Sequence, residues 1–111
     1  HADLEEVILR SRSHGITHIL IPGTDLRSSE EAVKIACAFD GVFAAVGVHP
    51  NDALTWQDQT ITQFHGLAGH SRVSAVGEIG LDYARNYAPA KVQQKAFSTQ
   101  LGLARELGLP A

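Results

Sequence analysis

Apolar residues along this chain follow two spacings, one typical of amphipathic helices and one typical of buried strands. Spacings of three and four residues predict four helices, over residues 3–14, 28–40, 55–68 and 89–107. Short, continuous apolar runs between them predict strands at 17–21, at 42–48 and from residue 73 onward. The order of elements is therefore helix and strand in strict alternation.

Residues that commonly cap helices mark the ends of these predicted helices. The spacing of a capping box occurs at Asp3 with Glu6 and again at Ser28 with Glu31. Thr55 is predicted to cap the third helix, and Pro89 suits the first turn of the fourth. The apolar residues expected to face the core are, helix by helix, Leu4, Val7 and Ile8; Ala32, Val33, Ala36 and Phe39; Ile61, Phe64, Leu67 and Ala68; and Phe97, Leu101 and Ala104.

Helices alternating with uniformly apolar strands predict an α/β fold with a parallel sheet. Two architectures fit this order, an open doubly wound sheet and part of a (β/α)8 TIM barrel. No Gly-x-Gly-x-x-Gly motif follows the first strand, so a nucleotide-binding open sheet has little support. Polar residues follow each strand, at 23–25, 49–51 and Glu78, where barrel enzymes keep their active sites. The barrel is favoured, and the 111 residues make about half of one, since a complete barrel needs about 250.

Composition and charge narrow the possible partners. The chain is 44% hydrophobic and 19% charged, an ordinary globular balance, and its net charge is −3. A nucleic acid partner would therefore have to be met by local groups or by metal ions. The single cysteine, Cys37, fits a reducing compartment, and we expect it in or beside the apolar face of the second helix. No apolar run is long enough to span a bilayer, so we expect no membrane partner and a cytoplasmic protein.

The segment 73–83 carries the first candidate for chemistry. An apolar strand leads into Glu78, which stands between Gly77 and Gly80. A carboxylate at the end of a buried strand is costly to desolvate unless a positive group meets it, and glycines allow a ligand or another backbone to approach. The residues alone leave two interpretations open, a metal-binding or acid/base glutamate and a glutamate paired with an Arg or Lys.

Four short motifs, in this order along the chain, carry a resemblance to a known family: Ile-Pro-Gly-Thr-Asp at 21–25, Ala-Val-Gly-Val-His-Pro at 45–50, Gly-Glu-Ile-Gly-Leu-Asp-Tyr at 77–83 and Glu-Leu-Gly-Leu-Pro at 106–110. Together they cover nearly the whole chain and resemble the TatD family of metal-dependent deoxyribonucleases. The resemblance implies an amidohydrolase-like (β/α)8 barrel. It also implies a hydrolase that cleaves phosphodiester bonds of DNA, its substrate, by a two-metal mechanism.

The resemblance assigns roles to two residues. Glu78 corresponds to the glutamate after the fourth strand that contacts the pair of divalent ions, with Mg, Mn and Zn left open. A hard carboxylate oxygen suits such ions. His49 corresponds to the histidine after the third strand that faces the substrate phosphate, although a histidine before proline at a strand end is often structural. Family members often carry a second histidine where this chain has Asn51, so no contact is assigned there.

Other polar residues of the same edge have weaker support. Arg85 is a reasonable phosphate partner by its chemistry, and it shares its loop with Asp82 and Tyr83. Asp82 could equally cap the backbone of its own loop. The remaining histidines share no spacing that would place two on one metal, and we expect them at the surface or at helix ends: His1, His14, His18, His65 and His70.

The family's other metal ligands, after its first, fifth, sixth and eighth strands, have no counterpart in this sequence. We therefore expect residues 1–111 to be a single partial barrel domain, helix 1 through helix 4 with strands 2–4, without the first strand and everything after the fourth helix. Such a chain would be inactive alone. A metal-dependent amidohydrolase acting on a C–N bond and a non-catalytic half-barrel that acts by assembly remain alternatives. Unpaired strand edges and exposed interior residues predict that the isolated chain self-associates, aggregates or is molten, unless the missing barrel half covers them.

Overall fold

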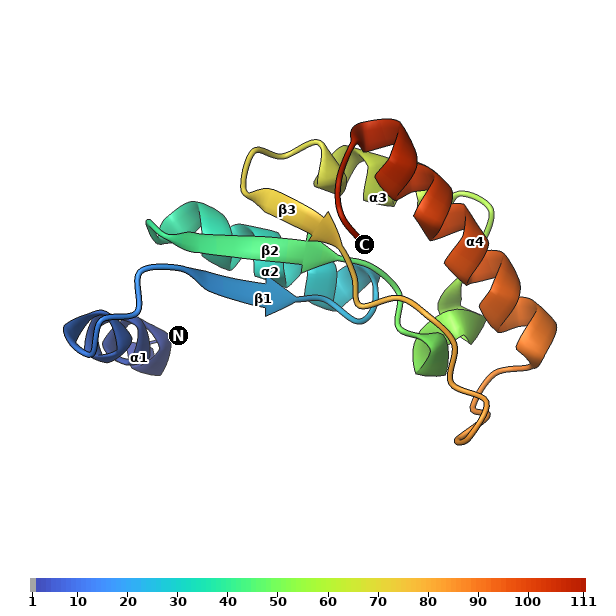
Figure 1. Cartoon of the computed structure of the whole chain (residues 1–111), viewed down its shortest axis with the longest axis horizontal. Helices are drawn as coiled ribbons and strands as arrows, with labels where there is room; N and C mark the ends of the chain where they lie inside the picture. The colour runs from blue at the N-terminus through green and yellow to red at the C-terminus, as the bar shows by residue number, and fades with distance from the viewer. Residues whose placement is uncertain (1) are drawn as a thin grey trace.

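The computed structural model describes residues 2–111 of the chain. Helices and strands alternate along it as the sequence predicts, with one additional 3-10 helix (Figure 1). The elements are α1 (Ala2–Ser13), β1 (Ile19–Pro22), α2 (Leu26–Ala38), β2 (Val42–Val46), the 3-10 helix η1 (Pro50–Thr55), α3 (Thr60–Ala68), β3 (Val73–Val76) and α4 (Ala90–Leu107).

The three strands form one parallel sheet in the order β1-β2-β3. Ile19 lies opposite Val42, and Ala45 lies opposite Ala75, with one irregularity of register beside Ala44. Consecutive strands are neighbours and each connection contains a helix, which is the arrangement of repeated βα units. The predicted α/β fold with a parallel sheet is confirmed.

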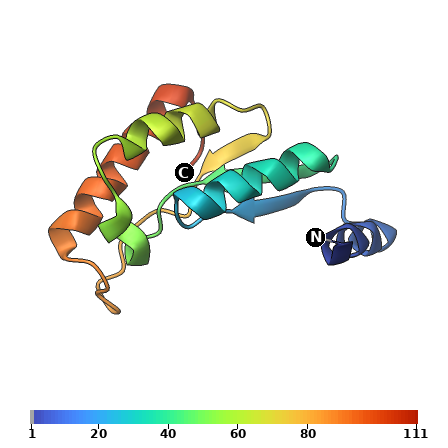
Figure 2. The ribbon, with the colours of Figure 1, turned by 180° about the vertical axis from the view of Figure 1, so that it is seen from behind.

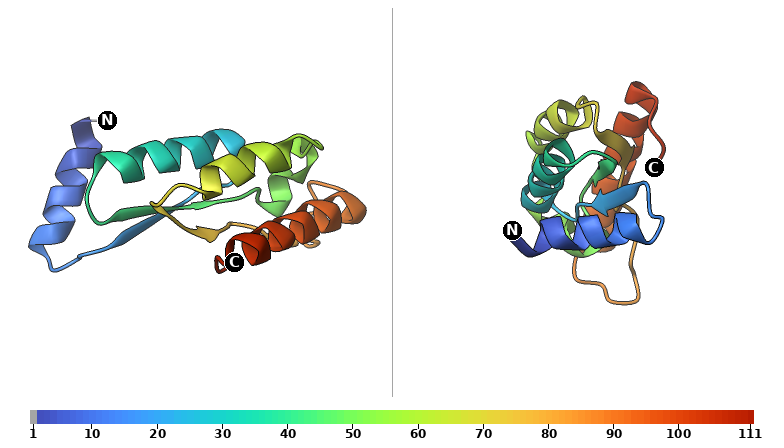
Figure 3. Two further views of the ribbon diagram at one scale, coloured as in Figure 1. Left: turned by 90° about the horizontal axis from the view of Figure 1, so that it is seen from above. Right: turned by 90° about the vertical axis from the view of Figure 1, so that its left-hand side faces the viewer.

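Helices α2 and α3 cover the same face of the sheet (Figure 2). Along β2 the side chains of Val42, Ala44 and Val46 point into this helical layer and pack in one core with Phe64. Helix α4 packs against α3, β3 and η1, so α2, α3 and α4 succeed one another around the strands (Figure 3). On the opposite face of β1, Leu20 is 53% exposed. A sheet with helices outside and an open inner face is what a partial barrel requires.

The residues after α4 return to the sheet. Gly108 ends the helix in the left-handed region, at φ 67°, as predicted. The backbone carbonyl of Pro110 then accepts a hydrogen bond from the amide of Val76 at 2.9 Å. Figure 1 shows this end of the chain beside β3. The chain is therefore directed along the edge of β3, where the next parallel strand of a barrel lies.

Three predicted helix starts are wrong by a few residues. Helix α2 begins at Leu26 because Asp25, and not Ser28, is its N-cap; Ser28 is the third residue of the helix and completes the capping box with Asp25. Thr55 ends η1 and does not cap α3, which begins at Thr60. Asp3 lies inside the first turn of α1, since the helix already includes Ala2. At α2 both Asp25 and Ser28 have side chains suited to an N-cap, and the hydrogen bond from the Ser28 amide to the Asp25 carboxylate gives that position to Asp25.

Several predicted core positions also differ. Val7 is 47% exposed and Leu101 is 39% exposed, whereas Gln93 and Gln100 of α4 are each only 1% exposed. Cys37 is exposed as well, with its Sγ 3.3 Å from Nε2 of His70, so it is not buried in the apolar face of α2, which was one of its two predicted placements. Among residues 2–111, no helix is both long and apolar enough to cross a membrane.

Candidate functional site

Backbone hydrogen bonds join the segments that follow the three strands. The amide of Glu78 donates to the carbonyl of Gly23 at 2.9 Å, and the amide of His49 donates to the carbonyl of Thr24 at 2.8 Å. The segment after β1 thus contacts the segments that follow both β2 and β3. Thr24, His49 and Glu78 meet at one edge of the sheet, at the carboxyl ends of its strands. The predicted common edge is confirmed.

Two glycines make this close approach possible. A Cβ at Gly23 would lie 2.1 Å from Oγ of Ser29, and a Cβ at Gly47 would lie 3.0 Å from the carbonyl oxygen of Glu78. Ser29 is fully buried, and its hydroxyl bonds both the amide and the carbonyl of Gly47, at 3.2 and 3.3 Å. A side chain at either glycine would therefore push the strand ends apart.

Gly77 and Gly80, the glycines on either side of Glu78, have a different role from Gly23 and Gly47. At Gly77 and Gly80 a Cβ would meet no atom within 4 Å, and Gly80 has a φ of 139°, which favours glycine. These two positions leave open space beside Glu78. They do not bring another segment of this chain close to it.

Glu78 has a solvent-exposed side chain. Its carboxylate neither accepts a hydrogen bond nor forms an ion pair within residues 2–111, so the alternative of a structural pairing with Arg or Lys is not seen there. The carboxylate carries no large desolvation cost, because the strand end is not buried at this residue. An exposed, unpaired carboxylate is available to a ligand.

His49 is half-buried and caps η1. Its Nδ1 accepts a hydrogen bond from the amide of Asn51 at 3.1 Å. Because Nδ1 holds the lone pair, the neutral ring carries its hydrogen on Nε2. The structural role of this histidine and a donor role for Nε2 are therefore compatible. Near it, Oδ1 of Asn51 is buried and has no partner within residues 2–111.

The loop after β3 is held by its own polar groups. Oδ1 of Asp82 accepts the amide of Arg85 at 3.1 Å, which confirms that Asp82 caps its own loop. The side chain of Arg85 is exposed. The amide of Asp82 donates to Oε1 of Gln93 at 2.8 Å.

Two glutamines of α4 were not found from the sequence. Gln93 bonds the loop after β3, and Gln100 bonds the amide of Val48 at 2.7 Å, directly before His49. Both belong to one buried helix face with Ala96 and Leu103. The seven-residue separation of Gln93 and Gln100 could have indicated that both lie on one helix face. A search for apolar residues alone does not find buried glutamines.

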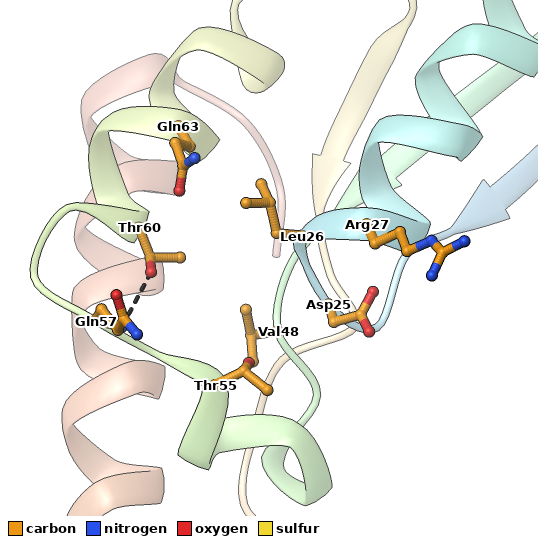
Figure 4. A pocket seen from close by; sticks show the side chains of 8 residues that line it. All are labelled: Asp25, Leu26, Arg27, Val48, Thr55, Gln57, Thr60 and Gln63. Atoms are coloured by element: carbon orange, nitrogen blue, oxygen red, sulfur yellow. Dashed lines mark hydrogen bonds between the residues drawn. The ribbon is translucent and has the colours of Figure 1, made fainter.

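A cleft lies between the amino end of α2 and the start of α3 (Figure 4). Asp25 stands at its edge, and two hydrogen bonds from Ser28, first from its amide and then from its hydroxyl, lower the pKa of the Asp25 carboxyl. On the wall formed by the start of α3, Oγ1 of Thr60 accepts the amide of Gln57 at 3.0 Å (Figure 4). Neither His49 nor Glu78 lines it. The residues that do are Asp25, Leu26, Arg27, Val48, Thr55, Gln57, Thr60 and Gln63.

Comparison with known proteins decides the family. The model of the family described as TatD related DNase matches residues 1–111. This chain belongs to the TatD family. Two relatives named 3'-5' ssDNA/RNA exonuclease TatD are similar to it: that of Cronobacter sakazakii is 44% identical over 108 residues, and that of Dickeya dadantii is 42% identical over 110. These alignments cover 97% and 98% of this chain but only 41% and 42% of the relatives, so the chain spans about two-fifths of their length.

A solved TatD structure has the same fold. The crystal structure of YjjV, a TatD homologue of Escherichia coli, superposes with a TM-score of 0.86 at 28% identity, over 98% of this chain and 43% of YjjV. The parallel sheet and its alternating helices are thus part of a TatD TIM barrel. Glu78 and His49 lie at the carboxyl edge of this partial barrel.

Residues 2–111 of this TatD chain do not build a complete metal centre between them. Within residues 2–111, no three side chains of His, Cys, Asp or Glu are placed to hold one ion. His14, His18, His65 and His70 are exposed, as predicted, and His1 lies outside the described residues. The chemistry of Glu78 fits a single hard ligand, because a carboxylate without a partner offers both of its oxygens.

Proposed function

We propose that this chain supplies one edge of a divalent-metal-dependent hydrolase of the TatD type that cleaves phosphodiester bonds of DNA. The observation that carries the proposal is the exposed carboxylate of Glu78, which has no partner within residues 2–111. The backbone amides of Glu78 and His49 bond the neighbouring residues Gly23 and Thr24, which holds both residues at one edge of the sheet. The names of the relatives extend the substrate to single-stranded DNA and RNA. Those names also favour a phosphodiester over the C–N bond of an amidohydrolase.

Each residue has a distinct part in the proposal. Glu78 holds one or both of two divalent ions, with Mg, Mn and Zn as candidates; when bound, such ions generate hydroxide at neutral pH and stabilise the attacking and leaving oxygens. His49 donates from Nε2 to a phosphate oxygen, since its Nδ1 is engaged by the backbone. Arg85 pairs with a second phosphate oxygen through its guanidinium. The unpaired Cys37 fits a reducing compartment, and we place the activity in the cytoplasm.

A chimera tests these roles. In it, this chain replaces the matching segment of the Cronobacter sakazakii relative, which provides the other strands of the barrel. Glu78→Gln keeps the size of the side chain and removes its charge, and we expect about a hundredfold or greater loss of cleavage rate together with weaker metal binding. His49→Ala should slow cleavage less and leave metal affinity nearly unchanged, because its partner is the phosphate.

The matched control is Glu5→Gln, the same change at an exposed position of α1. It should leave cleavage of a single-stranded oligonucleotide and calorimetric metal affinity at the level of the parent chimera. If Glu78→Gln behaved like Glu5→Gln in both measurements, Glu78 would be structural and the proposal would be lost.

A further inference from the structure

The loop between β3 and α4 presents aromatic and basic side chains to solvent. Tyr83 is 50% exposed and Tyr87 is 63% exposed, and the exposed Arg85 stands midway between them in the sequence. We call residues 82–88 the Tyr-Arg-Tyr loop. Both tyrosines of the chain are in it, and the loop extends from the carboxyl end of the sheet (Figure 1).

This loop is closed by a buried side chain. Gln93, which is 1% exposed, accepts the amide of Asp82 at 2.8 Å and donates to the carbonyls of Asp82 and Ala88 at 3.2 and 2.8 Å. One amide group thus holds both ends of the loop. Inside it, the amide of Asn86 donates to the carbonyl of Asp82 at 3.3 Å, and Asn86 has a φ of 53°. The exposed side chains therefore project from a preformed backbone.

The two tyrosines differ in how they are held. The hydroxyl of Tyr83 accepts a hydrogen bond from Nε2 of Gln94 at 2.8 Å, which fixes that ring beside the start of α4. Tyr87 makes no hydrogen bond or ring contact within residues 2–111, and most of its surface faces water. A large aromatic ring on a preformed loop offers a stacking face that loses little conformational freedom on binding.

We propose that the Tyr-Arg-Tyr loop binds single-stranded nucleic acid, with a base stacked on Tyr87 and a backbone phosphate paired with Arg85. The inference rests on the proposed function, whose site lies on the segment leading into this loop. The net charge of the chain is −3, so its overall field does not attract phosphates, and affinity has to come from stacking and from a local cation. A single strand is required because the faces of duplex bases are already stacked on one another.

Binding by the parent chain and its variants is measured within the chimera, where the rest of the barrel is present. Fluorescence anisotropy in EDTA, which prevents catalysis, follows a labelled thymidine oligomer of roughly ten nucleotides. Tyr87→Leu should weaken binding by about five- to a hundredfold, the range for loss of one base stack, and Tyr87→Phe should restore it. Arg85→Gln should weaken binding and reduce the slope of log affinity against log salt by about 0.7, as expected for one phosphate of a single strand. An abasic oligomer of the same length should bind the parent chain and Tyr87→Leu equally.

Leu9→Ala and Arg10→Gln are the matched controls, since both remove an exposed side chain of α1, and they should bind like the parent chain. If Tyr87→Leu bound the oligomer as tightly as Leu9→Ala, or if the abasic oligomer showed the same loss as the intact one, stacking would be excluded. If the parent chain bound no oligomer, the proposed nucleic-acid site would be refuted. These outcomes are read in EDTA and are therefore separate from the test of metal-dependent cleavage. Normal cleavage by Glu78→Gln would refute the nuclease roles and leave this binding result standing.

Discussion

Replacing Gln100 tests whether α4 holds the segment that carries His49. The side chain of Gln100 is almost fully buried, and its Oε1 accepts the amide of Val48 at 2.7 Å. Its Nε2 donates to the carbonyls of Val48 at 3.3 Å and Ala96 at 3.1 Å. Gln100→Leu keeps a side chain of similar volume but leaves both backbone groups of Val48 without partners. Val48 is 2% exposed, so water does not readily replace them.

The expected cost follows from these unpaired groups. A buried donor or acceptor left without a partner costs about 1–3 kcal/mol, so the loss for two groups, with some relaxation, is about 2–4 kcal/mol. For a barrel of the size of the chimera this lowers the melting temperature by about 5–12 °C. Because Val48 immediately precedes His49, the cleavage rate should fall as well, while metal affinity should be retained.

Urea denaturation of the chimera measures the change in the free energy of unfolding. Hydrogen exchange of peptides containing Val48 should become faster at the same time, because that amide loses its protection. Gln63→Leu is the matched control, an identical change at an exposed position of α3, and should stay within about 0.5 kcal/mol of the parent. If Gln100→Leu were equally neutral and Val48 stayed protected, the buried amide would not hold this segment and the reasoning would be refuted.

Three other predictions concern the fold. Gly23→Ala should destabilise the chimera by about 1–3 kcal/mol in urea denaturation, because its Cβ would lie 2.7 Å from the backbone of the buried Ser29. The control Gly102→Ala, whose Cβ would meet no atom within 4 Å, should be neutral or stabilising by up to about 1 kcal/mol. Asp25→Ala should cost about 1 kcal/mol at neutral pH. Because the pKa of Asp25 is lowered in the folded state, its contribution to the free energy of unfolding is complete above the unfolded pKa of 3.8 and is lost as pH falls through the folded pKa. The stabilities of the parent and of Asp25→Ala should therefore converge in acid unfolding. A stability difference that stayed equal at all pH values would contradict this. The isolated chain should be oligomeric, aggregated or molten in ultracentrifugation and thermal unfolding, since β1 has an unpaired edge within residues 2–111, and a sharply melting monomer would rule this out.

Local patterns in the sequence determined the order of the elements and the edge of the sheet that carries the site. The strands were recognisable because they are short and apolar throughout. The end of α4 was recognisable because residue 108 is a glycine, which readily adopts the positive φ that the structure has there. Parallel strands place their carboxyl ends together, so residues far apart in the sequence, such as His49 and Glu78, could be assigned to one edge without coordinates. Both signals depend only on neighbouring residues and on the direction of the chain.

The tertiary structure decided what depends on distant partners. Glu78 is exposed and not buried, and the helix face of α4 that turns inward carries Gln93 and Gln100, where the apolar pattern had favoured Leu101. A glutamine can be buried only where its amide finds partners. Besides the local carbonyl of Ala96, Gln100 bonds both backbone groups of Val48, 52 residues earlier in the chain. No local spacing encodes such a partner, because the pairing exists only after α4 has packed beside β3 and η1.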